Sequence, residues 1–147
     1  MSEYSAERHL AGLKQFQRAT VDHVMARWFT DPDPVRRFLV ADETGLGKSM
    51  VARGVIARLL ERLQHEPEVR RIDIVYVCSN ADIAEQNLKR LDVLGTGSRH
   101  QSTRLSLLAR DSGFLDGAPH PEVGKRVNLI ALTPGTSPCW RLARSPT

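Results

Sequence analysis

The chain has 147 residues, a length that supports one hydrophobic core and burial of about 70% of the unfolded surface. Its 41% hydrophobic and 26% charged residues are ordinary for a globular protein, and no apolar run is long enough to cross a bilayer. The N-terminal stretch MSEYSAERHLAGLKQFQ carries acids and lacks the apolar segment of a signal peptide, so we expect a cytoplasmic protein without a membrane partner. The net charge of +4 permits a polyanionic partner without requiring one.

Residues 8–29 are predicted to form one amphipathic helix, because apolar side chains recur there at helical spacing. This stripe consists of Leu13, Phe16, Val21, Val24, Met25 and Trp28. The sequence TDPDP at residues 30–34 then ends the helix, since each proline disfavours helix in the residue before it and donates no backbone hydrogen bond. A turn or short linker is expected there.

A strand, a glycine-rich turn and a helix are predicted next. The apolar run FLVA at residues 38–41 predicts a short buried strand. From Ser49 onward, apolar residues recur every four positions, at Val51, Val55, Leu59 and Leu63. Gly54 lies inside this helix at a cost of about 1 kcal/mol relative to alanine, so we expect it to permit close packing against a sheet.

Alternation of strands and helices continues through the rest of the chain. Buried strands are predicted for IDIVYVCS (72–79) and VNLIALT (127–133), with RLSLLA (104–109) as a third candidate and polar connections at 95–103 and 110–126. Ser79 or Asn80 can cap a helix after the first of these strands, and its apolar face consists of Ile83, Ala84, Leu88 and Leu91. This order predicts an α/β fold with a mainly parallel sheet covered on both faces, and with ligands at the carboxyl ends of the strands.

The stretch ADETGLGKS at residues 41–49 contains the parts of a phosphate-binding loop. Such a loop needs converging backbone N–H groups, a lysine that neutralises the outer phosphates and a hydroxyl for Mg²⁺. We therefore predict phosphate contacts from Thr44, Gly45, Leu46, Gly47, Lys48 and Ser49, with Lys48 as the catalytic charge and Ser49 as the Mg²⁺ ligand. Asp42 stands where the full pattern has glycine, and the alternative is an ordinary glycine-rich turn followed by an exposed lysine.

The acid pair ahead of this loop resembles motif I of superfamily 2 DEAD/DEAH-type helicases and DNA translocases, especially the chromatin-remodelling-type branch. Upstream, LKQFQRATVDHV at residues 13–24 resembles the Q-type motif of that family. The resemblance implies ATP and Mg²⁺ as cofactors, and it implies that Gln17 binds adenine, whose edge suits an amide that both donates and accepts. The alternative is that Gln17 is an ordinary helix-surface residue.

Two later segments resemble the nucleic-acid-contacting motifs of the same family. VYVCSNADIAEQ at residues 75–86 is similar to motif Ia, with Ser79 and Asn80 at its polar positions. TPGT at residues 133–136 is similar to motif Ib, and it assigns phosphate-chain contacts to Thr133, Gly135 and Thr136. Contacts of this kind hold a strand in register without reading its sequence, so the implied partner is a nucleic acid, with DNA favoured. For Ser79 the alternative role is that of a helix cap.

The resemblance covers residues 13 to about 137 and implies only part of one RecA-like P-loop lobe. It divides the chain into a Q-type motif with linker (1–34), a partial ATP-binding lobe (35–137) and an unpatterned tail (138–147). The family next requires an apolar strand ending in an Asp-Glu pair, which binds Mg²⁺ and orients water, and then a second lobe. Neither occurs in this sequence. We therefore expect the N-terminal fragment of a motor, which binds nucleotide with ATP turnover near background.

Two other functions stay open at this point. A small self-contained P-loop kinase would need an arginine-rich lid, and the arginines of the second half form no such pattern: Arg99, Arg104, Arg110 and Arg126. A noncatalytic domain that binds nucleotide or nucleic acid and associates with another protein is the second alternative.

Overall fold

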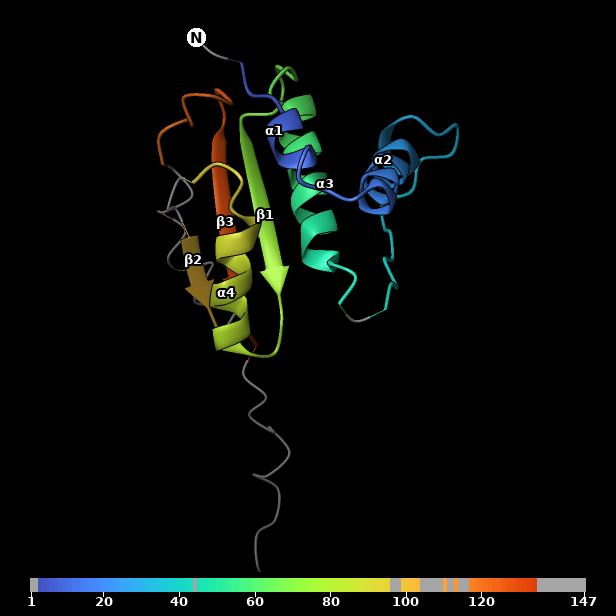
Figure 1. Ribbon diagram of the computed structural model, residues 1–147. Coiled ribbons are helices and arrows are strands. Elements are labelled where there is room, and N and C mark those ends of the chain that lie inside the picture. The colour runs from blue at the N-terminus through green and yellow to red at the C-terminus, as the bar shows by residue number, and fades with distance from the viewer. Residues whose placement is uncertain are drawn as a thin grey trace, which may run out of the picture.

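A computed structural model describes residues 3–43, 45–95, 99–103, 110, 113 and 117–134 of the chain. Four helices and three strands lie in these ranges (Figure 1). In chain order they are α1 (Glu7–Leu10), α2 (Gln15–Phe29), α3 (Lys48–Leu63), β1 (Arg71–Val77), α4 (Ala81–Leu91), β2 (Arg99–Ser102) and β3 (Arg126–Leu132).

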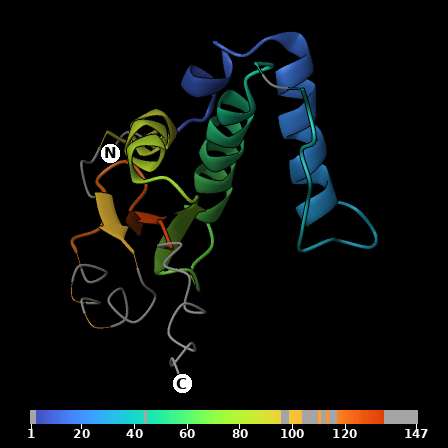
Figure 2. The ribbon, with the colours of Figure 1, turned by 90° about the horizontal axis from the view of Figure 1, so that it is seen from below.

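The three strands form one open parallel sheet in the order β1-β3-β2. Val75 of β1 pairs with Ile130, and Gln101 of β2 pairs with Ala131, so β3 is the central strand. The view along the strands shows α3 and α4 on the same face of the sheet (Figure 2). The predicted α/β class with a parallel sheet flanked by helices is confirmed. The expectation of helices on both faces is wrong for the part of the chain that the structure describes.

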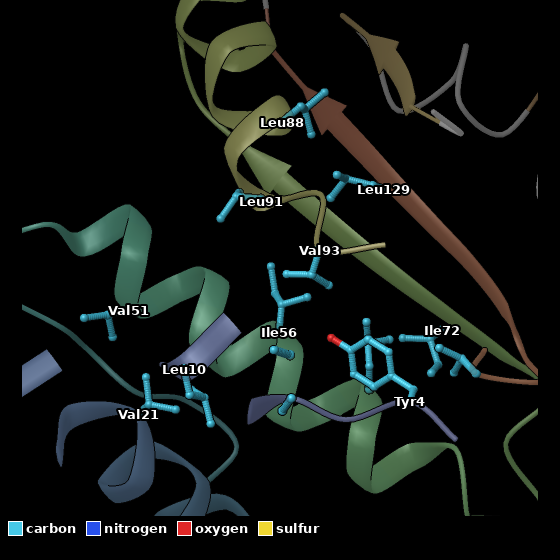
Figure 3. Packing of buried hydrophobic residues seen from close by; sticks show 14 of the residues in the cluster. Tyr4, Leu10, Val21, Val51, Ile56, Ile72, Leu88, Leu91, Val93 and Leu129 are labelled. Atoms are coloured by element: carbon cyan, nitrogen blue, oxygen red, sulfur yellow. The ribbon is translucent and has the colours of Figure 1, made fainter. Parts of the chain in front are cut away.

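One hydrophobic cluster joins the helical layer to the sheet (Figure 3). Ile56 and Leu60 of α3 pack there with Leu88 of α4 and with Ile72 and Leu129 of the sheet. The N-terminal segment belongs to the same cluster through Tyr4, Ala6 and Leu10. Backbone groups secure this segment, because Tyr4 N–H donates to Gln64 Oε1 (3.2 Å) and Ala6 N–H donates to Glu61 Oε1 (2.9 Å).

The helices α3 and α4 and the strands β1 and β3 confirm four predicted elements. Asn80, the second of the two proposed caps, accepts a hydrogen bond from Ile83 N–H (3.0 Å) at the start of α4. Ile83 itself is 51% exposed, so its predicted place on the apolar face is wrong.

The predicted single helix over residues 8–29 is two helices, α1 and α2, separated by a turn. Leu13 N–H donates to Leu10 C=O (3.0 Å), and the chain is extended at Lys14 before α2 begins. Gln17 Oε1 accepts a hydrogen bond from Lys14 N–H (3.0 Å), which caps the new helix. A capping interaction of this kind starts a helix at Gln15 even though the apolar spacing runs through the turn.

The predicted buried strand at residues 38–41 is wrong. These residues have no strand partner in the described part of the chain, and Leu39 is 83% exposed. Phe38 packs edge-on against His23 of α2, with ring centroids 5.5 Å apart. The segment runs alongside α2 (Figures 1 and 2). A strand needs a neighbouring strand to satisfy its backbone, and residues 38–41 pair with none of the described strands.

The predicted polar connection at 95–103 contains a strand instead, since β2 pairs with β3 over Arg99–Ser102. Its sequence RHQS has no apolar residue, so the hydrophobic pattern gave no signal for it. Polar, short strands are common at the edges of sheets, where β2 lies. The strand candidate at residues 104–109 falls outside the described residues.

Gly54 is a site of close packing, but its closest neighbours lie in α2 and in the turn before it and not in the sheet. A Cβ atom added there would lie 2.8 Å from Val21 Cγ2 and 2.9 Å from Leu13 Cδ1. We expect Gly54→Ala to lower the free energy of unfolding by about 1–3 kcal/mol, because overpacking outweighs the helix propensity of alanine. Urea unfolding would measure this, with Gly12→Ala as control, since a Cβ at Gly12 meets nothing within 4 Å. Equal stability of the two variants would contradict the packing argument.

Tyr4 should make the fold sensitive to alkali. Burial raises the pKa of its phenol to about 12 from the usual 10.0. The folded protein therefore holds this proton more tightly than the unfolded chain does, and the resulting stability is complete below pH 10 and lost as pH rises towards 12. The hydroxyl is buried without a hydrogen-bond partner in the described residues.

We expect Tyr4→Phe to remove roughly 2–3 kcal/mol of the stability loss between pH 10 and 12, without destabilising the protein near pH 7. Thermal unfolding across this pH range measures the effect. Tyr76→Phe is a suitable comparison, because the Tyr76 hydroxyl accepts a hydrogen bond from Asn87 Nδ2 (2.7 Å) and its loss should act at neutral pH. An unchanged alkaline transition in Tyr4→Phe would refute this role.

Candidate nucleotide-binding site

The glycine-rich loop ahead of α3 has the backbone shape that its sequence predicts. Gly45 and Gly47 both adopt positive φ angles, 92° and 83°, a region that side-chain-bearing residues avoid. Gly47 is also the N-cap of α3, and none of the described side chains caps this helix. The 16-residue helix therefore starts at the loop, so its first backbone N–H groups and the positive end of its dipole lie next to the loop. This arrangement suits an anion.

Lys48 bonds to the loop itself. Its Nζ donates to the carbonyl oxygens of Asp42 (2.7 Å) and Glu43 (3.0 Å). These two carbonyl oxygens hold the ammonium group at the loop. Phosphate oxygens are stronger acceptors than carbonyl oxygens, because they carry charge. The side chain is exposed, so an anion in the loop can replace these two bonds without unpacking the core.

Gln17 connects α2 to the loop. Its side chain is 6% exposed, and its Nε2 donates to Leu46 C=O (2.9 Å). A Cβ atom at Gly47 would lie 2.5 Å from this Nε2, so the glycine leaves the space that the amide occupies. Since Oε1 accepts from Lys14 N–H (3.0 Å), each end of the amide already has a backbone partner. The predicted adenine contact of Gln17 stays a prediction, and the structure adds a loop-holding contact.

The other residues predicted to contact phosphate or Mg²⁺ lie next to Lys48 in the sequence. Leu46 is exposed, and its carbonyl is the group that Gln17 holds. Ser49 is half-buried in the first turn of α3, next to Lys48. Thr44 lies outside the described residues. The structure therefore places Gly45, Gly47, Lys48 and Ser49 in one contiguous loop and helix start.

The carboxyl ends of β1 and β3 lie on the side where α3 begins (Figure 1). Ser79 and Asn80 follow β1 and are exposed, whereas Thr133 follows β3 and is 4% exposed. The register pairs Val77 with Leu132, so these three polar residues lie together at the carboxyl end of the sheet. The hydroxyl of Thr133 is buried without a partner in the described residues, while its N–H donates to Ser102 C=O (2.9 Å). Gly135 and Thr136 lie outside the described residues.

A groove of about 420 Å³ lies between the sheet and the segment that leads into the loop. Its walls come from α2 and residues 38–40 on one side and from α3 and β1 on the other, including Trp28, Phe38, Val40, Val55 and Tyr76. Lys48 is the one charged residue among the described residues that line it. The sequence pattern did not reveal this groove, because it depends on how segments distant in the chain are placed.

Comparisons with protein-family models, with curated proteins and with solved structures find no match to this chain. No helix in the described residues is long and apolar enough to cross a membrane. The site therefore has to be interpreted from its own residues.

Proposed function

We propose that this chain is the nucleotide-holding, N-terminal part of a RecA-like lobe of an ATP-dependent nucleic-acid helicase or translocase of superfamily 2. The observation that carries the proposal is the loop before α3. It has two positive-φ glycines, a helix start that no described side chain caps, and Lys48 held by two loop carbonyls that phosphate oxygens can replace. Such a loop provides backbone N–H groups, a cation and the Ser49 hydroxyl for Mg·ATP.

The nucleic-acid part of the proposal is supported by the placement of the motif Ia and Ib segments. Ser79 and Asn80 follow β1, and Thr133 follows the neighbouring parallel strand β3. Polar residues from both segments therefore lie at the carboxyl end of the sheet. A phosphate chain at this end of the sheet would meet the exposed Ser79 hydroxyl and Asn80 amide. DNA is the favoured nucleic acid by resemblance.

Catalysis needs groups that these elements do not provide. The described strands β1 and β3 are followed by Cys78-Ser79 and Thr133-Pro134, where the family has an Asp-Glu pair after a strand. Phosphoryl transfer depends on charge neutralisation and on a positioned water, and an arginine finger alone contributes about 10³ to 10⁵ in rate. The chain is therefore expected to bind nucleotide without turning it over efficiently.

The test is to measure equilibrium binding of Mg·ATP to the purified chain and, in the same preparation, phosphate release with and without single-stranded DNA. We expect saturable binding with phosphate release close to the rate of free ATP. Absence of nucleotide binding would refute the phosphate-loop assignment. DNA-stimulated hydrolysis at the rate of a complete motor would refute the account of the missing catalytic groups.

A further inference from the structure

The strand β1 is an edge strand whose free side borders the apolar groove. It pairs only with β3 among the described strands. Three side chains of β1 line the groove: Ile74, Val75 and Tyr76. The opposite wall includes Phe38 and Val40 from a segment that is extended and apolar like a strand.

On this side the backbone of β1 makes no hydrogen bond to any of the described residues. In a parallel strand, the N–H and C=O of one residue point to the same side, and the side alternates along the strand. Cys78 N–H donates to Leu132 C=O (3.1 Å), and Arg70 C=O accepts from Arg126 N–H (3.3 Å). Even-numbered residues therefore face β3, and Asp73, Val75 and Val77 direct their peptide groups towards the open edge.

The side chains at this edge are apolar and accessible. Val75 is 49% exposed and Val77 is 59% exposed, which is unusual for two valines at the end of a sheet strand. A small apolar molecule could cover these side chains, but it would leave three peptide groups unpaired at intervals of about 6.6 Å. An extended polypeptide satisfies both the apolar surface and the row of peptide groups.

We propose that the groove accepts one β-strand from a partner polypeptide, an extended apolar segment that pairs with Asp73, Val75 and Val77 of β1. This mode is β-strand addition, in which main-chain hydrogen bonds provide affinity and the apolar walls select the side chains. Only one strand can pair with β1 at a time, because β3 occupies its other side. The proposal concerns the sheet edge and does not rest on nucleotide binding by the loop.

Trp28 provides a direct readout, because it lines the groove. Trp140→Phe leaves it as the single tryptophan, since the chain has two. The probe is the peptide acetyl-Lys-Val-Ile-Val-Ile-Lys-amide, and its matched control is the same peptide with its four apolar residues N-methylated. We expect a saturable change of Trp28 fluorescence with the first peptide and binding at least about tenfold weaker with the second, which keeps the side chains but cannot donate.

Two further measurements locate the peptide. Hydrogen exchange should slow at the amides of Asp73, Val75 and Val77, which face the open edge, when the peptide binds. Val75→Pro removes one edge-facing donor without removing a hydrogen bond to β3, and we expect it to weaken binding roughly tenfold. The N-methylated peptide keeps the test independent of how well the proline variant folds. Lys89→Ala, on α4 and outside the groove lining, should retain peptide binding.

Four outcomes would overturn the proposal. Equal binding of the N-methylated peptide would show apolar adsorption without strand pairing, and no binding of either peptide would show that the edge is closed. A gain in affinity of more than tenfold on removal of residues 135–147 would mean that the chain's own end occupies the groove. Sedimentation that reveals a dimer, abolished by Val75→Pro, would identify a second copy of the chain as the occupant.

Discussion

Replacing Lys48 with alanine is expected to weaken Mg·ATP binding by about 100-fold, with little change in the fold. In the free protein, Lys48 Nζ donates to two loop carbonyls, Asp42 and Glu43. On binding, these are exchanged for charged phosphate oxygens, and hydrogen bonds to charged groups contribute about 1.5–3 kcal/mol. The alanine variant loses this favourable binding free energy. In its free state, water can solvate the carbonyls of Asp42 and Glu43, so the fold should change little.

The measurement is a titration of the purified protein with Mg·ATP, with thermal unfolding to confirm that the variant is folded. Lys89→Ala is a matched control, because it makes the same change of net charge at a side chain that is 60% exposed on α4 and paired with Glu85 (2.8 Å). We expect Lys89→Ala to bind like the original protein. Unchanged affinity in Lys48→Ala would remove the phosphate-loop assignment and the proposed function with it.

The elements that could be predicted from the sequence are those whose pattern is local. Val51, Leu60 and their neighbours repeat at helical spacing and lie in α3, and the run VNLIAL lies in β3. The glycine-rich loop before α3 belongs to this group, since its glycines, Lys48 and Ser49 are close together in the sequence and its backbone geometry depends on glycine itself.

The elements that were missed depend on partners distant in the chain. The runs FLVA at 38–41 and IDIV in β1 are both predicted strands, yet only the second lies in the sheet. Strand formation depends on packing and pairing with distant segments, which a local apolar run does not specify. The residues closest to Gly54, Val21 and Leu13, are likewise distant in the chain, so the sequence did not show what Gly54 packs against. The spacing of apolar residues predicts which face of an element is buried, but it does not predict which other element covers that face.

The candidate site divides in the same way. The loop could be predicted, but its contact with Gln17 joins residues 29 positions apart and became apparent only in the fold. The groove beside β1 likewise needs α2, residues 38–40, α3 and the sheet together. The sequence therefore predicts a phosphate ligand for the loop, whereas the structure shows that the Gln17 amide contacts the loop backbone.

Gln17→Ala is expected to lower the free energy of unfolding by about 1–3 kcal/mol and to weaken phosphate binding at the loop roughly tenfold. The side chain is buried, and its removal leaves Leu46 C=O and Lys14 N–H without their amide partner. Leu46 lies between the two positive-φ glycines, so a loop without this contact samples other conformations before it can bind an anion.

Three ligands separate the loop-holding contact from the adenine contact that the family resemblance implies. Mg²⁺-tripolyphosphate has no base, so its weaker binding to Gln17→Ala reports the loop alone. A larger loss for ATP than for GTP would show that the amide also reads adenine, which is chemically feasible because Gln17 has a second donor and a second acceptor site. Gln86→Ala, at an exposed position of α4, controls for the loss of a helical glutamine. Unchanged tripolyphosphate binding by Gln17→Ala would show that the loop keeps its shape without α2.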